Sequence, residues 1–238
     1  TQPKYVILES ATLHRDDRLE KMVQLISGEH GIFQVSDRPY LVYKIHTDVK
    51  VQEYKNTQGL DSSRLYSDLS MNAHRNSIII DILETNRHKK FITLSKVKEH
   101  INELDRLATE QGLEHDTLFG NKSKYKDSFA LFGTYSKIGK GFDEAKACKD
   151  YKGRPTDVVI LCHSTPQWQI YEQARGRGMR YKATKKVPLV VVWLYDGNNM
   201  VKNHWKELET THKWFEKTNA TIIEVKDYPF GGLVFPGL

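Results

Sequence analysis

The feature that most limits how this chain can fold is a short apolar run that leads into a one-sided helical pattern. Asp157–Cys162 is rich in β-branched residues and predicts a buried strand. The stretch that follows, Gln167–Arg180, can bury one side of a short helix through its apolar and aromatic residues, which are Trp168, Ile170, Tyr171 and Ala174. A buried strand followed by a half-buried helix is the unit from which α/β sheets are built.

Other segments show the same alternation. Further strands are expected at Tyr5–Leu8, Pro39–His46, Phe91–Leu94, Phe129–Phe132, Pro188–Tyr195 and Thr221–Val225. Helices are expected over Ser63–Asn86, over the segment that begins at Ser95 as N-cap, and over Asn199–Thr218. The first of these helices is expected to turn Ala73 toward the core, and the polar stretch from Val49 to Ser63 predicts a linker or flexible loop.

Two further apolar features have structural expectations. Trp205 and Trp214 favour roles as core or interface anchors over roles as platforms for nucleic-acid bases. The glycine-rich ending Phe230–Leu238 is expected to dock on this domain or a neighbouring one, or to fray.

Length and charge set the outer limits. With 238 residues, of which 39% are apolar, the chain can bury a full domain core and an appendage. The net charge of +6 and the pI near 9.1 favour a polyanionic partner. The longest apolar run, Val187–Tyr195, contains Pro188 and is far shorter than the roughly 20 residues of a membrane span.

Cysteine usage predicts a reducing, intracellular setting, either cytoplasm or nucleus. Cys148 and Cys162 are the two cysteines, they form no C-x-x-C pair, and the histidines are scattered. Neither a disulfide framework nor a zinc site is therefore indicated, and no signal peptide is recognised.

The arginine-rich end of the predicted helix is the strongest chemical signal. Gln173, Arg177 and Arg180 project from its far end with glycines between them. Planar guanidinium groups at this spacing suit the bidentate binding of phosphate oxygens. A solvated basic turn is the alternative interpretation.

Three polar segments follow predicted strands. Ser95 and Lys96 would sit where free backbone amides at a helix start point toward an anion. Leu118–Tyr125 is a basic loop with Lys122, but its residues are in the wrong register for a phosphate-binding P-loop. The third segment, Gly133–Ala145, combines glycines with hydroxyls at Thr134 and Ser136 and with the carboxylate of Asp143.

The pattern Gln173-x-x-Gly176-Arg177-x-x-Arg180 resembles the sixth motif of superfamily 2 helicases. The segment from Thr134 through Gly141 to Asp143 resembles the fifth motif with one extra residue, and Ser95-Lys96 resembles the fourth. Ser10-Ala11-Thr12 is similar to the third motif, which closes the first of the two RecA-like domains. The style of the fifth motif is nearest to the group of XPB-type, phage-recombination and poxvirus transcript-release helicases.

This resemblance implies a RecA-like fold with a mainly parallel sheet and helices on both faces. Residues 1–38 would be the end of the first domain and its connector, and residues 39–238 would be the second domain. A viral source is compatible with the resemblance and would place the protein in the host cytoplasm or the virion.

The resemblance also implies roles for individual residues. Arg177 and Arg180 would act as arginine fingers with Gln173 beside them, and Gly141 and Asp143 would join them in binding ATP. Contacts to DNA or RNA would come from Ser95, Lys96, Lys122, Thr134 and Ser136. Ser10 and Thr12 would couple the domains, while ATP and Mg²⁺ would be held mainly by the first domain.

Two rival functions remain open at this point. One is a translocase that moves on a duplex without separating its strands, and the other is a basic nucleic-acid-binding module that never meets ATP. The chain by itself is expected to lack ATPase activity, because Gly-x-x-x-x-Gly-Lys-Ser/Thr occurs nowhere in it. Asp143-Glu144-Ala145 is not interpreted as a magnesium-binding DEAx box, since it follows a glycine loop rather than a buried strand.

Overall fold

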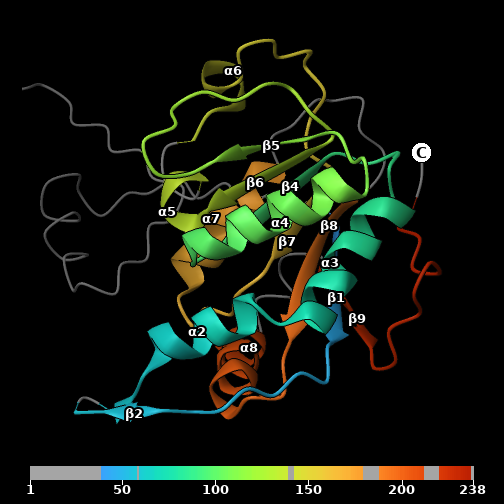
Figure 1. Cartoon of the computed structure of the whole chain (residues 1–238). Coiled ribbons are helices and arrows are strands. Elements are labelled where there is room, and N and C mark those ends of the chain that lie inside the picture. The colour runs from blue at the N-terminus through green and yellow to red at the C-terminus, as the bar shows by residue number, and fades with distance from the viewer. Residues whose placement is uncertain (1–38, 58, 139–141, 179–187, 212–219, 237–238) are drawn as a thin grey trace, which may run out of the picture.

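The computed structural model describes residues 39–57, 59–138, 142–178, 188–211 and 220–236 (Figure 1). Seven parallel strands form the main sheet in the order β5-β6-β4-β7-β8-β1-β9. Their bounds are β1 Tyr40–His46, β4 Phe91–Ser95, β5 His115–Leu118, β6 Ala130–Thr134, β7 Val158–Leu161, β8 Leu189–Tyr195 and β9 Ala220–Val225. The predicted strands within the described ranges are confirmed, and β5 is an addition that the sequence did not predict.

Helices cover both faces of this sheet, as expected. They are α2 Ser62–Ser70, α3 Ala73–Thr85, α4 Lys98–Glu110, α5 Tyr135–Ile138, α6 Glu144–Ala147, α7 Trp168–Gly178 and α8 Asn199–Thr211. One core joins the sheet to α2, α5, α7 and α8, while a second core joins the opposite face to α3 and α4. Neighbouring strand residues such as Val42 and Tyr43 enter different cores, because successive side chains of a strand point to opposite faces.

Parallel pairing brings all the strand ends of one kind to one side of the sheet. Ser95 at the end of β4 is the register partner of Thr134 at the end of β6, and β7 and β8 end on the same side. We call this side the carboxyl edge; it comprises the last residues of the seven strands. In open α/β sheets ligands collect there.

The expected helix over Ser63–Asn86 is wrong in one respect, because two helices occupy it. Met71 ends α2, with its N–H donating to the carbonyl oxygens of Ser67 and Leu69, and the Asn72 side chain then caps α3 by accepting from the Arg75 N–H at 3.0 Å. Asparagine at an N-cap satisfies an amide that the first helical turn leaves free. The break also exposes Ala73, which had been expected in the core.

The polar stretch after β1 is more ordered than predicted. It contains a short antiparallel hairpin of β2 (Lys55–Asn56) and β3 (Gly59–Leu60). The Asn198 side chain, at the start of α8, donates to the Val51 carbonyl oxygen and accepts from the Val51 N–H. A predicted loop is thereby fastened to the domain by one buried asparagine.

The chain after β9 docks on this domain, which selects one of the three outcomes expected for it. Phe235 is buried against Tyr43, with ring centroids 4.9 Å apart. Asn86 holds the same segment from α3, because its amide donates to the Leu233 carbonyl oxygen and accepts from the Phe235 N–H.

The tryptophan prediction is confirmed for Trp205 and lies outside the described residues for Trp214. Trp205 is fully buried, its indole N–H donates to the Leu194 carbonyl oxygen, and its ring stacks on Trp193 at 4.7 Å. Among the described residues, no helix is both long enough and apolar enough to cross a membrane.

Candidate functional site

The carboxyl edge brings together several of the residues predicted to contact nucleic acid. Ser95 and Thr134 lie side by side as register partners, and both are buried. The Thr134 hydroxyl lies 3.2 Å from that of Ser136, which is exposed on α5. Ser136 is therefore the hydroxyl of this group that directly faces solvent.

Ser95 does not cap the helix that follows it, and this expectation is wrong. Val97 occupies the N-cap of α4 without a side-chain capping bond, while the Ser95 hydroxyl accepts from the Val97 N–H at 3.0 Å. The Lys96 N–H donates to Nδ1 of His163 at 3.2 Å. The N–H groups of Lys96 and Val97 thus have partners inside the protein.

The Lys96 side chain lies between α2 and the end of β7. Its ammonium donates to the Ser164 carbonyl oxygen at 2.7 Å and to the Tyr66 hydroxyl at 3.1 Å. Burial lowers the pKa of Lys96 to about 8. No carboxylate pairs with Lys96 among the described residues, so an arriving phosphate would stabilise its charged form.

A buried histidine network under this edge was missed by the sequence analysis. Besides accepting from the Lys96 N–H, His163 lies 3.0 Å from the Ser70 hydroxyl through Nε2, and Nε2 of His100 lies 2.9 Å from the side-chain amide oxygen Oδ1 of Asn76. The bond from the Lys96 N–H assigns the proton of neutral His163 to Nε2. The position of His163 directly after the strand pattern Asp157–Cys162 was the signal that could have revealed it.

The two buried histidines of this network predict that the folded domain loses stability at acidic pH. Burial, followed by the positive charge of Arg75, holds the pKa values of His163 and His100 well below their usual range, so both stay neutral in the folded protein. Below pH ~6.5 the unfolded chain binds protons at these positions and the folded chain does not. The free energy of unfolding should therefore fall by about 1.4 kcal/mol per pH unit for each histidine as the pH drops.

Urea unfolding between mildly acidic and neutral pH measures this slope. His100→Gln should roughly halve the contribution of the pair, whereas His88→Gln should leave it unchanged because His88 is exposed. Equal slopes in the wild type and His100→Gln would contradict the assignment.

The basic loop after β5 holds the next predicted contact. The Lys122 ammonium forms an ion pair with Asp116 of β5 and also donates to the Thr117 hydroxyl at 3.3 Å. Its side chain remains 41% exposed, so a phosphate can reach it at the expense of the pair with Asp116.

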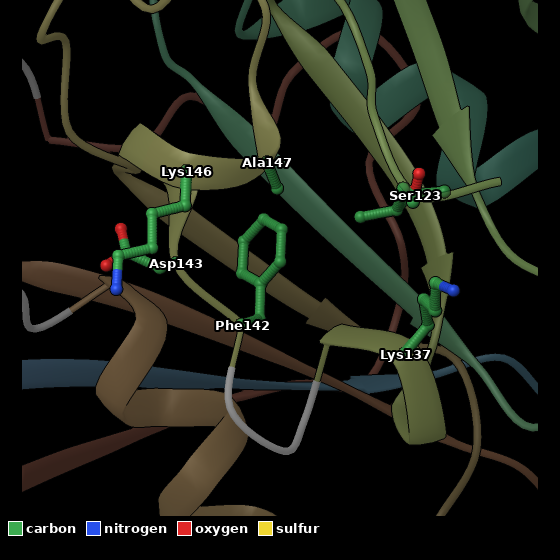
Figure 2. Close-up of a pocket in the computed structure, with 7 residues that line it drawn as sticks. Ser123, Lys137, Phe142, Asp143, Lys146 and Ala147 are labelled. Carbon is green, nitrogen blue, oxygen red and sulfur yellow. The ribbon is translucent and has the colours of Figure 1, made fainter.

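A cavity of about 250 Å³ lies between this loop and helices α5 and α6 (Figure 2). Ser123 and Lys137 line one side of it, Asp143 and Lys146 the other, and the Phe142 ring stands between them. The fold thereby joins the basic loop that carries Lys122 to the segment that resembles the fifth helicase motif.

Asp143 has a structural task at this position. Its carboxylate accepts from the Ala145 N–H at 3.1 Å and so caps α6. Glu144 is buried and accepts from the Thr156 hydroxyl at 3.1 Å. Both carboxylates thus take part in bonds that hold α6 in place, and the described residues contain no group of three or more potential metal ligands.

Helix α7 carries the arginine pattern away from the carboxyl edge. Tyr171 and Ala174 are buried against the sheet as predicted, and Gln173 is half-buried. Farther along, the Arg175 guanidinium bonds to Glu172 at 2.6 Å and lies over the Tyr40 ring, 4.7 Å from its centroid. Because Tyr40 begins β1, the arginine end of α7 lies at the amino ends of the strands.

The direction of α7 follows from the parallel topology of the sheet. The helix starts after β7 and runs back along the sheet, as the connection to a parallel strand requires. Arg175, to which the sequence analysis gave no role, is the residue that fixes this end of α7. The side chain of Arg177 and all of Gly141, Arg180, Ser10 and Thr12 lie outside the described residues.

Comparison with known proteins shows which proteins this chain resembles. No family model matches the chain. "Putative helicase 161L" of Invertebrate iridescent virus 6 is 28% identical over 233 residues, covering 89% of this chain and 50% of the relative. "Putative helicase 055L" of Frog virus 3 is 26% identical over 182 residues, covering 74% of this chain and 40% of the relative.

Among solved structures, S. cerevisiae Dbp5 bound to RNA and ADP BeF3 superposes with a TM-score of 0.53 at 15% identity, covering 89% of this chain and 49% of that one. The chain has a RecA-like fold and is similar in sequence to two viral proteins that are named putative helicases. It spans about half the length of these curated relatives.

Proposed function

We propose that this domain is the C-terminal half of an ATP-dependent helicase or translocase and that it supplies arginine fingers to ATP and backbone contacts to nucleic acid. The observation that carries the proposal is the pairing of Ser95 with Thr134 beside the half-buried Lys96, whose ammonium lacks a carboxylate partner in the described structure. A phosphate backbone would supply the missing negative charge.

The two contact regions would lie at opposite ends of the strands of one sheet. Phosphates would meet Lys96, Ser136 and Lys122 at the carboxyl edge. Arg177 and Arg180 would extend from the other end of α7 toward ATP and Mg²⁺ held by a first RecA-like domain. Because α7 packs on β7, a change in the nucleotide would move the whole domain rather than one loop.

ATP itself would find only part of its site here. Gln173 and Asp143 would support the arginines and the nucleotide, but nothing in the chain has the P-loop pattern. Arginine fingers act only when another group holds the γ-phosphate in line with the attacking water. Mg²⁺ is accordingly assigned to the first domain, with residues 1–38 as its end and connector.

The isolated domain should therefore bind nucleic acid without hydrolysing ATP. Filter binding over a salt series should show weak affinity, little sequence preference and a steep dependence on salt, because phosphate contacts release counterions. Phosphate release with saturating nucleic acid should stay at the buffer background. Joining the domain to its first RecA-like domain should create ATPase activity that nucleic acid stimulates.

The same assay separates the rival functions. A basic binding module would show no ATPase in either form, which would refute the proposal. Turnover by the isolated domain that Arg177→Ala abolishes would refute the prediction of an inactive half. Strand separation with ATP distinguishes a helicase from a duplex translocase, and both agree with the proposal.

A further inference from the structure

Two loops that are distant in the sequence meet beside the edge strand β5, where the Lys126 N–H donates to the Asp116 carboxylate at 2.7 Å. Tyr125 and Cys148 form an isolated parallel bridge, in which the Tyr125 N–H donates to the Ala147 carbonyl oxygen at 3.1 Å and the Lys149 N–H donates to the Tyr125 carbonyl oxygen at 2.9 Å. The side chains of Tyr125 and Cys148 are both buried. The bridge thus fixes the segment before β6 against the segment after α6.

Exposed lysines flank this bridge on both segments. They are Lys124, Lys126, Lys146, Lys149 and Lys152, and we call them the lysine surface. None of them forms a salt bridge within the part of the chain that the structure describes. Five lysines grouped around one exposed carboxylate, Asp150, leave an excess of positive charge, and an anionic partner would offset its cost in free energy.

The nearby carboxylates are occupied. Asp127 is buried, where it pairs with the Lys90 ammonium at 2.6 Å and accepts from the Lys152 N–H at 3.0 Å. Asp150 accepts from the Asp127 N–H at 2.6 Å. These acids hold the backbone of the two loops in place, and the Lys124 ammonium donates across them to the Lys146 carbonyl oxygen.

The lysine surface runs along the outer side of the sheet. At one end Lys146 lines the cavity of Figure 2, near the end of β5. At the other end Lys152 lies beside Asp127 and Lys90, and Lys90 directly precedes β4. The lysine surface therefore extends from the carboxyl end of β5 toward the amino end of β4. Figure 1 shows α6 and these loops beyond β5, far from α2 and α8.

We propose that the lysine surface is a second nucleic-acid contact that binds the phosphate backbone outside the carboxyl edge. The choice of nucleic acid rests on the proposed function, while the surface itself rests on the geometry above. A protein partner fits less well, because interface centres are depleted in charge and rich in aromatic residues. The exposed large apolar side chains of the described structure, Met71, Ile222, Phe230 and Val234, belong to other segments.

The test compares two pairs of lysines in the domain as it stands. Lys126→Gln/Lys149→Gln changes the lysine surface, and Lys202→Gln/Lys206→Gln changes exposed lysines of α8 as a matched control. Affinity for a duplex and for a single strand of equal length is measured over a range of NaCl concentrations. In the first variant, the negative slope of log K against log salt for the duplex should become shallower by about 1.8, because each lost phosphate contact accounts for about 0.9.

Thermal unfolding of each variant confirms that the fold is kept. A slope that decreases only in the lysine-surface pair supports the proposal, and the arm with the larger loss tells whether the surface takes duplex or single strand. Wild-type slopes in both variants, or equal losses in both, would overturn it while leaving the carboxyl-edge proposal standing. Absence of salt-dependent binding by the unmodified domain would instead refute the proposed function.

Discussion

In the full-length protein, Arg177→Lys or Arg180→Lys should lower ATP turnover by roughly a thousandfold or more while keeping most of the affinity for nucleic acid. Lysine keeps the charge but loses the planar fork that binds two phosphate oxygens together. The positions follow Arg175, which the Tyr40 ring holds at the amino ends of the strands, away from Lys96 and Ser136. Steady-state ATPase and equilibrium binding on the same preparations measure the two effects.

Arg106→Lys is the matched control for this pair of variants. Arg106 is an arginine of α4 on the opposite face of the sheet, where it pairs with Glu103 and Glu110 at the surface. Its replacement should leave both turnover and affinity unchanged. Near-normal turnover in both Arg177→Lys and Arg180→Lys would refute the assignment of arginine fingers. A parallel loss of nucleic-acid affinity would show that these arginines also contact the strand.

Arg75→Ala should lower the free energy of unfolding by about 3–5 kcal/mol, since it leaves a buried carboxylate without its partner. Arg75 is fully buried, its Nε lies 2.9 Å from Asp196, and it also donates to the Cys162 carbonyl oxygen. Asp196 accepts a further bond from the Thr47 hydroxyl at 2.7 Å. Arg75 therefore ties α3 to the ends of β7, β8 and β1, and urea unfolding at neutral pH measures the loss.

A double replacement separates the cost of the unpaired charge from the net contribution of the pair. Arg75→Met combined with Asp196→Leu should be much less destabilised than Arg75→Ala, because no charge then remains buried alone. Arg106→Ala, which removes an exposed arginine, should leave the unfolding midpoint where it is. If Arg75→Ala lowers the free energy of unfolding no more than Arg106→Ala does, the prediction is wrong, and water must solvate the Asp196 carboxylate in the variant.

The sequence could predict most strands because each is decided locally. Phe91–Leu94 and Pro188–Tyr195 are apolar and rich in β-branched residues, and those properties favour a buried strand whatever the chain does elsewhere. His115–Leu118 escaped prediction because it is polar and half-buried at the edge of the sheet. This segment forms a strand because it pairs with β6, and such pairing cannot be predicted from a local sequence pattern.

The sequence allowed several residues of the candidate site to be predicted, but not how they are arranged in space. Motif order identified Ser95 and Thr134, and pairing then set them side by side. His163, His100 and Arg75 lie far apart in the sequence, and their buried bonds depend on how α2, α3 and α4 meet the carboxyl edge. The direction of α7 could have been inferred from parallel topology, but the position of its arginine end depends on the Arg175–Tyr40 contact.

The length of α7 has a consequence for any stepping motion. Its 11 residues make a rigid rod of roughly 16 Å between the arginine end and the carboxyl edge. If the domain pivots about ATP at the arginine end, a rotation of about 12° shifts the other end by about 3.4 Å, the axial rise of one nucleotide along a duplex strand. Helix α7 would then act as a lever that converts a small domain closure around ATP into a displacement of one nucleotide along the nucleic acid.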